Sequence, residues 1–82
     1  MQQLQEKVII YTTNTCPYCH MAMDYFKKNN ISFREINVEE HPDKVEEMVE
    51  KSGQMGVPVI DIKGQIIVGF NKNAIEHALW KK

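Results

Sequence analysis

The sequence lacks a long apolar run, a surplus of either charge, and all but two cysteines. No stretch reaches the roughly 18 consecutive apolar residues that a transmembrane helix needs. The net charge is -1, which argues against nucleic acid as a partner, because binding it requires a clustered basic surface. Residues 1–7 are polar and contain no apolar signal segment, so we expect a cytoplasmic protein with no membrane partner.

The chain has only two cysteines, and their spacing limits the roles that they can have. Cys16 and Cys19 are separated by two residues, and a disulfide across so short a loop would constrain the unfolded chain little. In a reducing compartment such a C-x-x-C pair is more typical of redox chemistry or metal binding than of a structural cross-link. The 82 residues suffice for one hydrophobic core, so we expect a single domain over 1–82 that acts as a monomer.

The first half of the chain predicts a strand, a helix and a second strand. The apolar, β-branched run Val8–Tyr11 indicates a buried strand over about 7–12. Pro17 suits the first position of a helix, where its missing N–H costs nothing, and we expect that helix to run to Lys28. Alternation over 31–38 predicts the second strand, and a shift in its phase indicates a strand covered on both faces or one with a bulge.

The second half predicts a helix, a hairpin and a final helix. In order, we expect a helix from Pro42 to Ser52, a strand over 57–62, a turn at Lys63-Gly64, a strand over 65–68 and a helix capped by Asn71. The order β-α-β-α-β-β-α indicates an α/β, thioredoxin-like fold with a four-stranded mixed sheet and helices on both faces. The methionines expected to pack in the core are Met21, Met23, Met48 and Met55.

Three motifs in this order resemble the glutaredoxin family. They are Tyr11-Thr12 leading into Cys16-Pro17-Tyr18-Cys19, then Val57-Pro58, then Gly69-Phe70 ahead of the last helix, and together they span nearly the whole chain. The resemblance implies a dithiol thiol–disulfide oxidoreductase that reduces protein disulfides, glutathione mixed disulfides or both. It also implies a cis peptide bond before Pro58, glutathione as reductant or substrate, and no bound metal or organic cofactor.

The position of each cysteine indicates its role. Thiol–disulfide exchange needs a thiolate, and we expect Cys16 at a helix N-terminus, where free N–H groups and the helix dipole favour negative charge. Cys19 is one turn further into the helix and is expected to be more buried. We therefore expect Cys16 to attack the substrate disulfide and Cys19 to resolve the mixed disulfide.

Further residues are expected to form the substrate or glutathione site. Val57 would offer its backbone N–H and C=O to an extended substrate. Tyr18 would offer an aromatic surface, and Phe70 would either face the substrate or cover the core. The predicted binding residues are Thr13, Pro17, Tyr18, Val57, Pro58, Gly69, Phe70 and Asn71.

Departures from the glutaredoxin pattern support an alternative electron donor. Many glutathione-using members carry a lysine where this chain has Thr13, an acidic turn where it has Asn71-Lys72, and a threonine where it has Gly56. Such groups would hold the carboxylates or the amine of glutathione. The alternative is a redoxin that thioredoxin reductase reduces, and that serves ribonucleotide reductase or another reductase with little use of glutathione.

Functions of another class are further alternatives. Cys16–His20 matches the C-x-x-C-H pattern of c-type haem attachment, with Met55 as an axial ligand. A zinc site would combine the two cysteines with His20, His41 or His77, but the histidines show no paired ligand spacing, so we expect no metal site. A thioredoxin-like module with redox-inert cysteines is the third alternative.

Overall fold

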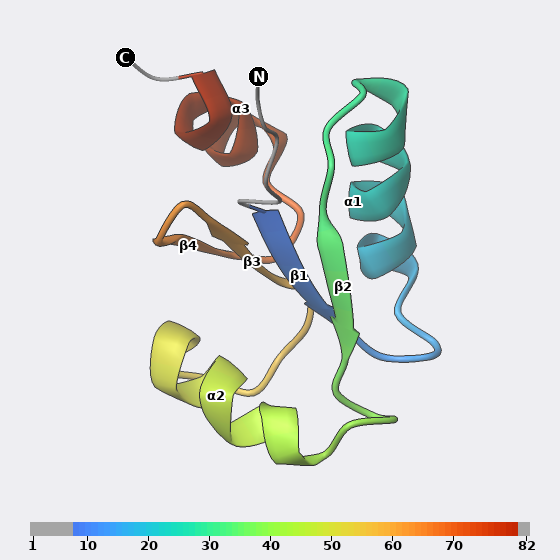
Figure 1. Cartoon of the computed structure of the whole chain (residues 1–82), viewed down its shortest axis with the longest axis vertical. Helices are drawn as coiled ribbons and strands as arrows, with labels where there is room; N and C mark the ends of the chain where they lie inside the picture. The colour runs from blue at the N-terminus through green and yellow to red at the C-terminus, as the bar shows by residue number, and fades with distance from the viewer. Residues whose placement is uncertain (1–7, 81–82) are drawn as a thin grey trace.

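The computed structural model describes residues 8–80, which form a four-stranded sheet with helices on both faces (Figure 1). The elements are β1 (Val8–Thr12), α1 (Pro17–Lys28), β2 (Arg34–Asn37), α2 (Asp43–Ser52), β3 (Val59–Ile62), β4 (Gln65–Val68) and α3 (Lys72–Trp80). The strand order is β2-β1-β3-β4; β1 and β2 are parallel, and β3 is antiparallel to both of its neighbours. The predicted thioredoxin-like fold is confirmed, whereas the expectation for residues 1–7 lies outside the described part. No helix within 8–80 has the length and apolar composition needed to cross a membrane.

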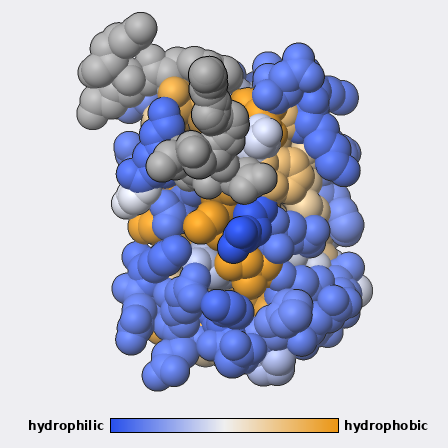
Figure 2. All heavy atoms as spheres, viewed as in Figure 1, coloured by the Kyte–Doolittle hydropathy of each residue, from blue (hydrophilic) through white to orange (hydrophobic). Residues whose placement is uncertain are grey.

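The sheet separates two apolar cores. Because alternate residues of a strand point to opposite faces, Ile10 joins one core and Tyr11 the other. The core under α1 and α3 contains Val8, Ile10, Ala22, Met23, Phe26, Ile60, Ile62, Ile67 and Ile75; the core under α2 contains Tyr11, Val38, Met48 and Val59. Figure 2 shows hydrophilic side chains over most of one face, with apolar atoms visible between them.

The second strand is shorter than the sequence predicts. The Ile31 N–H donates to the Phe26 carbonyl at the end of α1 (2.8 Å), and the Phe33 ring packs against Phe26 with 5.4 Å between centroids. β2 is an edge strand in unbroken parallel register with β1, and its first two residues are exposed. The expected bulge or doubly covered strand is therefore wrong, because residues 31–33 pack against α1 instead of extending the strand.

The third strand begins two residues later than predicted, at Val59. The preceding Val57-Pro58 bond is cis, as the resemblance implies. Pro58 has no N–H for a strand partner, but its carbonyl accepts the Gly69 N–H (2.8 Å). The β3–β4 hairpin turns at Lys63-Gly64, where φ is 55° and 92°, as tight two-residue turns of this hand require.

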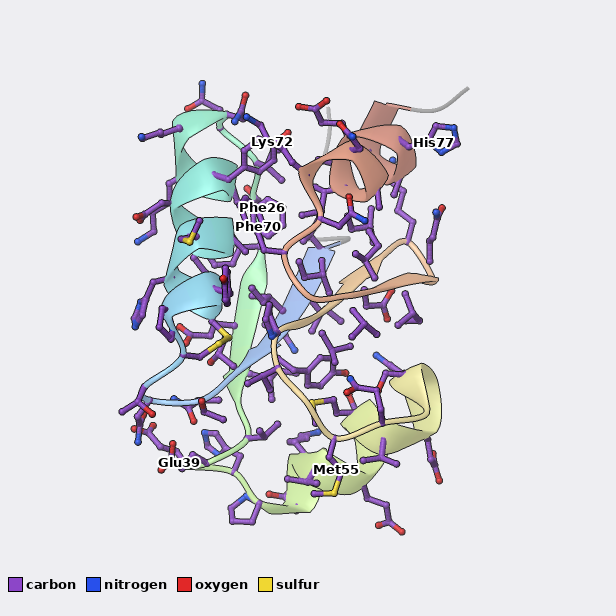
Figure 3. All side chains as sticks on the ribbon, turned by 180° about the vertical axis from the view of Figure 1, so that it is seen from behind. Phe26, Glu39, Met55, Phe70, Lys72 and His77 are labelled. Carbon is purple, nitrogen blue, oxygen red and sulfur yellow. A yellow bond between two sulfur atoms is a disulfide. The ribbon has the colours of Figure 1, made fainter. Side chains whose placement is uncertain are left out.

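Two smaller expectations also change. Pro42 caps α2 and is not its first helical residue, since the helix begins at Asp43. Met23 and Met48 are buried as expected, but Met21 and Met55 are 48% and 69% exposed. Met21 lies on α1 at the groove that this helix forms with α3, and Met55 lies in the loop between α2 and β3, where Figure 3 labels it.

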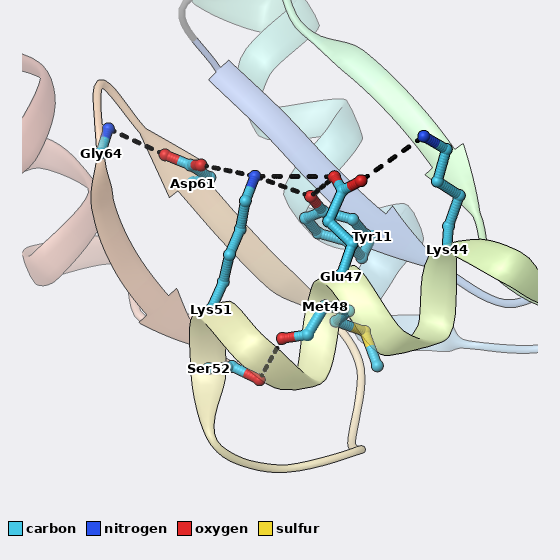
Figure 4. Close-up of polar contacts among 8 residues, drawn as sticks. All are labelled: Tyr11, Lys44, Glu47, Met48, Lys51, Ser52, Asp61 and Gly64. Carbon is cyan, nitrogen blue, oxygen red and sulfur yellow. Dashed lines mark hydrogen bonds and ion pairs between the residues drawn. The ribbon is translucent and has the colours of Figure 1, made fainter.

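A polar network connects α2 to the sheet (Figure 4). The Tyr11 hydroxyl donates to Glu47 and accepts from Lys51 Nζ (2.8 Å), which also donates to Asp61 (2.9 Å). Burial and the contact with Glu47 raise the pKa of Tyr11, while the hydrogen bond from Tyr11 lowers the pKa of Glu47. Burial by itself would lower the pKa of Lys51, but its bonds to Tyr11 and Asp61 raise it. Every polar group that the network buries thus has a partner.

Candidate functional site

Cys16 and Cys19 lie where β1 leads into α1, and they form a disulfide. Pro17 is the first residue of the helix, because its fixed φ suits that position. Cys16 is the N-cap; its backbone is extended (φ -106°, ψ 102°), and its Sγ accepts the Cys19 N–H at 3.2 Å. The two Cα atoms are 5.2 Å apart, within the usual span of a disulfide.

The two cysteines have different surroundings. Cys16 retains 7% of its surface exposed, whereas Cys19 is fully buried. Cys19 Sγ also lies 4.0 Å from the Tyr11 carbonyl oxygen, which would not favour a negative charge on that sulfur. Cys16 receives the Cys19 N–H and lies at the positive end of the helix dipole, so a thiolate is favoured at Cys16.

Val57 and Pro58 lie next to the loop that carries the cysteines. Val59 pairs with Tyr11, and this pairing places the two preceding residues beside the C-terminal end of β1. Pro58 is fully buried and Val57 is half-buried. Within the described residues Val57 makes no hydrogen bond of its own, so its N–H and C=O are available to an extended substrate.

Gly69 and Phe70 form the third predicted segment, which contacts the second segment at Pro58. The Gly69 N–H bond to Pro58 fixes this loop against the second segment. Gly69 has φ of 83°, a conformation that side chains disfavour. Phe70 packs on the core and meets the Tyr25 ring edge-on, with 6.1 Å between centroids. Asn71 Oδ1 accepts the Ala74 N–H (3.1 Å) and caps α3, so this side chain is engaged within the fold.

Three further predicted residues lie on the cysteine loop and the first turn of α1. Thr13 is half-buried and Pro17 is exposed. Tyr18, between the two cysteines in sequence, is 61% exposed. A ring so exposed beside a disulfide offers a partner an apolar surface with a polar tip.

A groove of about 530 Å³ lies between α1 and α3, and neither cysteine lines it. Phe70 is the one lining residue that the sequence predicted for the site, and Figure 3 shows it near Lys72. Lys72 Nζ lies 5.8 Å from the centroid of Tyr25, whose hydroxyl donates to Glu76 (3.2 Å); burial and Glu76 together raise the pKa of Tyr25. The lining residues are Met21, Asp24, Tyr25, Lys28, Asn29, Phe70, Lys72 and Glu76.

Hydrogen bonds that the sequence did not predict hold the loop ahead of Cys16. Glu39 Oε1 accepts the Asn14 N–H (2.9 Å), and Asn37 Nδ2 donates to Asn14 Oδ1 (2.8 Å). Asn37 Oδ1 in turn accepts the N–H groups of Glu39 (3.0 Å) and Glu40 (3.2 Å). The residues come from segments distant in sequence, and polar residues in turns carry no periodic signal that would pair them.

The side chains that a metal site would need are not gathered in one place. Within residues 8–79, no group of three or more His, Cys, Asp or Glu side chains is arranged to hold a metal ion. His20, His41 and His77 are exposed. The cysteine pair follows a strand of a mixed α/β sheet, a setting unlike the small helical cytochromes that the haem alternative requires.

Known proteins resemble this chain over most of its length. A family model described as Glutaredoxin matches residues 8–67. An uncharacterized glutaredoxin-like 8.6 kDa protein in the rubredoxin operon of Clostridium pasteurianum is 49% identical over 72 residues, which are 88% of this chain and 96% of that protein. Glutaredoxin 3 of Escherichia coli K12 is 44% identical over 62 residues, 76% of this chain and 75% of that protein. The solved NrdH-redoxin of Escherichia coli, titled as having a thioredoxin-like activity profile, superposes with a TM-score of 0.76 at 27% identity and covers 85% of this chain and 91% of its own.

Proposed function

This chain belongs to the glutaredoxin family and is a dithiol thiol–disulfide oxidoreductase, and from that premise we propose how it works and what reduces it. Cys16 is the nucleophile and Cys19 the resolving thiol. Thioredoxin reductase, and not glutathione, returns the protein to its dithiol form. Proteins with disulfides are the substrates, and the chain acts as a cytoplasmic monomer with one domain over 1–82 and no resident metal or organic cofactor.

The reaction follows from the positions of the two sulfur atoms. The Cys16 thiolate attacks one sulfur of the substrate disulfide; the new S–S bond forms as the old one breaks, and the released substrate thiolate takes up a proton. Cys19 then loses its proton and attacks Cys16 Sγ, which expels the second substrate thiol and leaves the Cys16–Cys19 disulfide. The 5.2 Å between the two Cα atoms allows this closure without displacement of the helix. Two electrons from the reductase regenerate both thiols.

The observation that carries the choice of reductant is the composition of the segments predicted to surround the disulfide. These three segments, residues 13–20, 54–58 and 69–71, contain neither lysine nor arginine. Thr13 occupies the position where many glutathione-using members of the family carry a lysine, and Lys72, which follows the third segment, lies over the Tyr25 ring. Glutathione has two carboxylates, which such a surface would leave without ionic partners. The thioredoxin-like activity profile named for the NrdH-redoxin structure agrees with a protein reductant.

Glutathione is the second candidate, on the strength of the 44% identity to glutaredoxin 3. Its cysteine portion would pair with the free backbone groups of Val57. Cys16 alone would then suffice for glutathione mixed disulfides, with a second glutathione completing the cycle.

A side-by-side reductant assay tests the proposal. The oxidised protein is mixed with insulin as the disulfide substrate and with either NADPH and thioredoxin reductase, or NADPH, glutathione reductase and glutathione. We expect sustained NADPH consumption with thioredoxin reductase and at least about tenfold less with glutathione. A faster rate with glutathione would overturn the choice of reductant, and Cys16→Ser in both assays supplies the background.

A further inference from the structure

We propose that Glu39 is a specificity-determining residue: it holds a negative charge beside the cysteine loop and so disfavours anionic low-molecular-weight thiols and disulfides. The inference deepens the proposed function and rests on its dithiol chemistry. It states how a charged residue near Cys16 affects which disulfides Cys16 can attack.

The structure fixes the Glu39 carboxylate on the loop that leads into the site. Its Oε1 accepts the Asn14 N–H (2.9 Å), and Figure 3 shows Glu39 beside the loop between β1 and α1. Asn37 holds both partners, since its side chain donates to Asn14 (2.8 Å) and accepts from the Glu39 N–H (3.0 Å). The carboxylate is therefore a fixed part of the loop and not a freely rotating surface charge.

The fixed charge is close enough to act on the reacting sulfur. Asn14 precedes Cys16 by two residues, a span of at most about 7 Å between Cα atoms, so the Glu39 carboxylate lies roughly 10 Å from the site. Repulsion between two unit charges about 10 Å apart slows the reaction of an anionic disulfide by about twofold at the dielectric constant of water. At half that dielectric constant the reaction is slowed by about fourfold. Glu40 and Asp43 are exposed near the same turn and add to the negative potential.

The segment that carries the cysteines has no positive charge of its own, and the cation of the neighbouring turn, Lys44, pairs with Glu47 (3.4 Å). Residues 8–26, from β1 through most of α1, contain neither lysine nor arginine. The uncharged Thr13 directly precedes Asn14, the residue that Glu39 holds. An anionic substrate thus meets repulsion from Glu39, while a neutral or cationic segment of a protein partner does not.

The test compares one anionic and one neutral disulfide. Protein reduced with dithiothreitol and then desalted is mixed with glutathione disulfide or with hydroxyethyl disulfide, and the second-order rate of oxidation is followed by acid quench and mass spectrometry. Glu39→Gln keeps the acceptor oxygen for Asn14 but removes the charge. We expect the ratio of the two rates, anionic over neutral, to rise about two- to fourfold in this variant at low salt. The matched control Glu40→Gln, whose side chain makes no hydrogen bond to the described residues, should shift the ratio less.

Salt dependence supplies a second, independent measurement. In the wild type the glutathione disulfide rate should rise toward that of Glu39→Gln in about 1 M salt, where the screening length falls to about 3 Å. An unchanged ratio, or an equal change in both rates, would show that Glu39 only supports the loop, and would overturn the proposal. Failure of the wild type to react with either disulfide would instead refute the dithiol chemistry itself, and no reductase takes part in this assay.

Discussion

At the scale of the residue, the chemistry depends on the unequal surroundings of Cys16 and Cys19. Cys16 caps α1 and retains some exposure, whereas Cys19 is fully buried behind it. The capping N–H and the helix dipole stabilise an anion on Cys16. Cys19 meets a carbonyl oxygen in place of a donor. One sulfur is therefore suited to attack and the other to resolve.

Replacement of each cysteine by serine should separate these two roles. Cys16→Ser should reduce insulin disulfides no faster than buffer, because the accessible thiolate is lost. Cys19→Ser should also lose insulin reduction but accumulate a mixed disulfide on Cys16, since nothing remains to release the substrate. Mass spectrometry of the quenched reaction detects that adduct. If Cys16→Ser traps the adduct and Cys19→Ser does not, the assignment is reversed.

At the scale of the element, α2 is held to the sheet by apolar and polar contacts together. Met48 is its buried residue, and Val45 packs against the same core. Tyr11, Glu47, Lys51 and Asp61 add the polar network of Figure 4. Because Tyr11 lies on β1, next to the cysteine loop in sequence, the network also holds the strand from which that loop leaves.

The Glu47 contact should make the stability of the protein depend on acid pH. Its folded-state pKa is lowered, chiefly by the hydrogen bond from Tyr11, so its contribution is present above the unfolded pKa of about 4.3 and is lost as pH falls through the lowered value. Glu47→Gln should lower the free energy of unfolding by about 0.5–1 kcal/mol at pH 7, a modest figure because the side chain is 38% exposed. Urea unfolding at pH 7 and about pH 3 should show this difference shrinking at the lower pH. The same loss at both pH values would contradict the charge argument, and Glu46→Gln, on the exposed side of α2, is the control.

At the scale of the whole molecule, one apolar core joins α1, which begins at the cysteines, to the loop that carries Phe70. Phe26 of α1 is fully buried in the core that α3 and the sheet share. Its ring contacts Tyr25 and Phe33, and Tyr25 in turn contacts Phe70. A chain of this size buries a limited core, so a single large side chain is a substantial part of its stability.

Phe26→Ala should therefore destabilise the protein by about 3–5 kcal/mol, because the lost ring leaves a cavity that neighbours only partly fill. Urea unfolding followed by circular dichroism measures the change, with a lower midpoint and an unchanged slope. Lys27→Ala, at the exposed neighbouring position, should alter stability by less than about 0.5 kcal/mol. A loss below about 1 kcal/mol for Phe26→Ala would show that the site does not depend on this core.

Local patterns in the sequence were enough for most of the elements. Apolar runs, Pro17 and Asn71 predicted β1, α1, the cap of α3 and the position of the cysteines between strand and helix, because each depends on neighbouring residues. The start of β2 and the exposure of Met21 and Met55 were predicted wrongly. In both cases a partner elsewhere in the chain, or its absence, decides whether an apolar side chain packs.

By itself, then, the sequence determined the order of elements and the dithiol at the start of α1, since both follow from spacing along the chain. Only the tertiary structure decided what surrounds that dithiol. The pairing of Val59 with Tyr11 brings in Val57, the Gly69 bond to Pro58 brings in Phe70, and Glu39 reaches Asn14 across 25 positions. Contacts between such distant residues leave no period in the sequence, because they depend on how the sheet and helices pack.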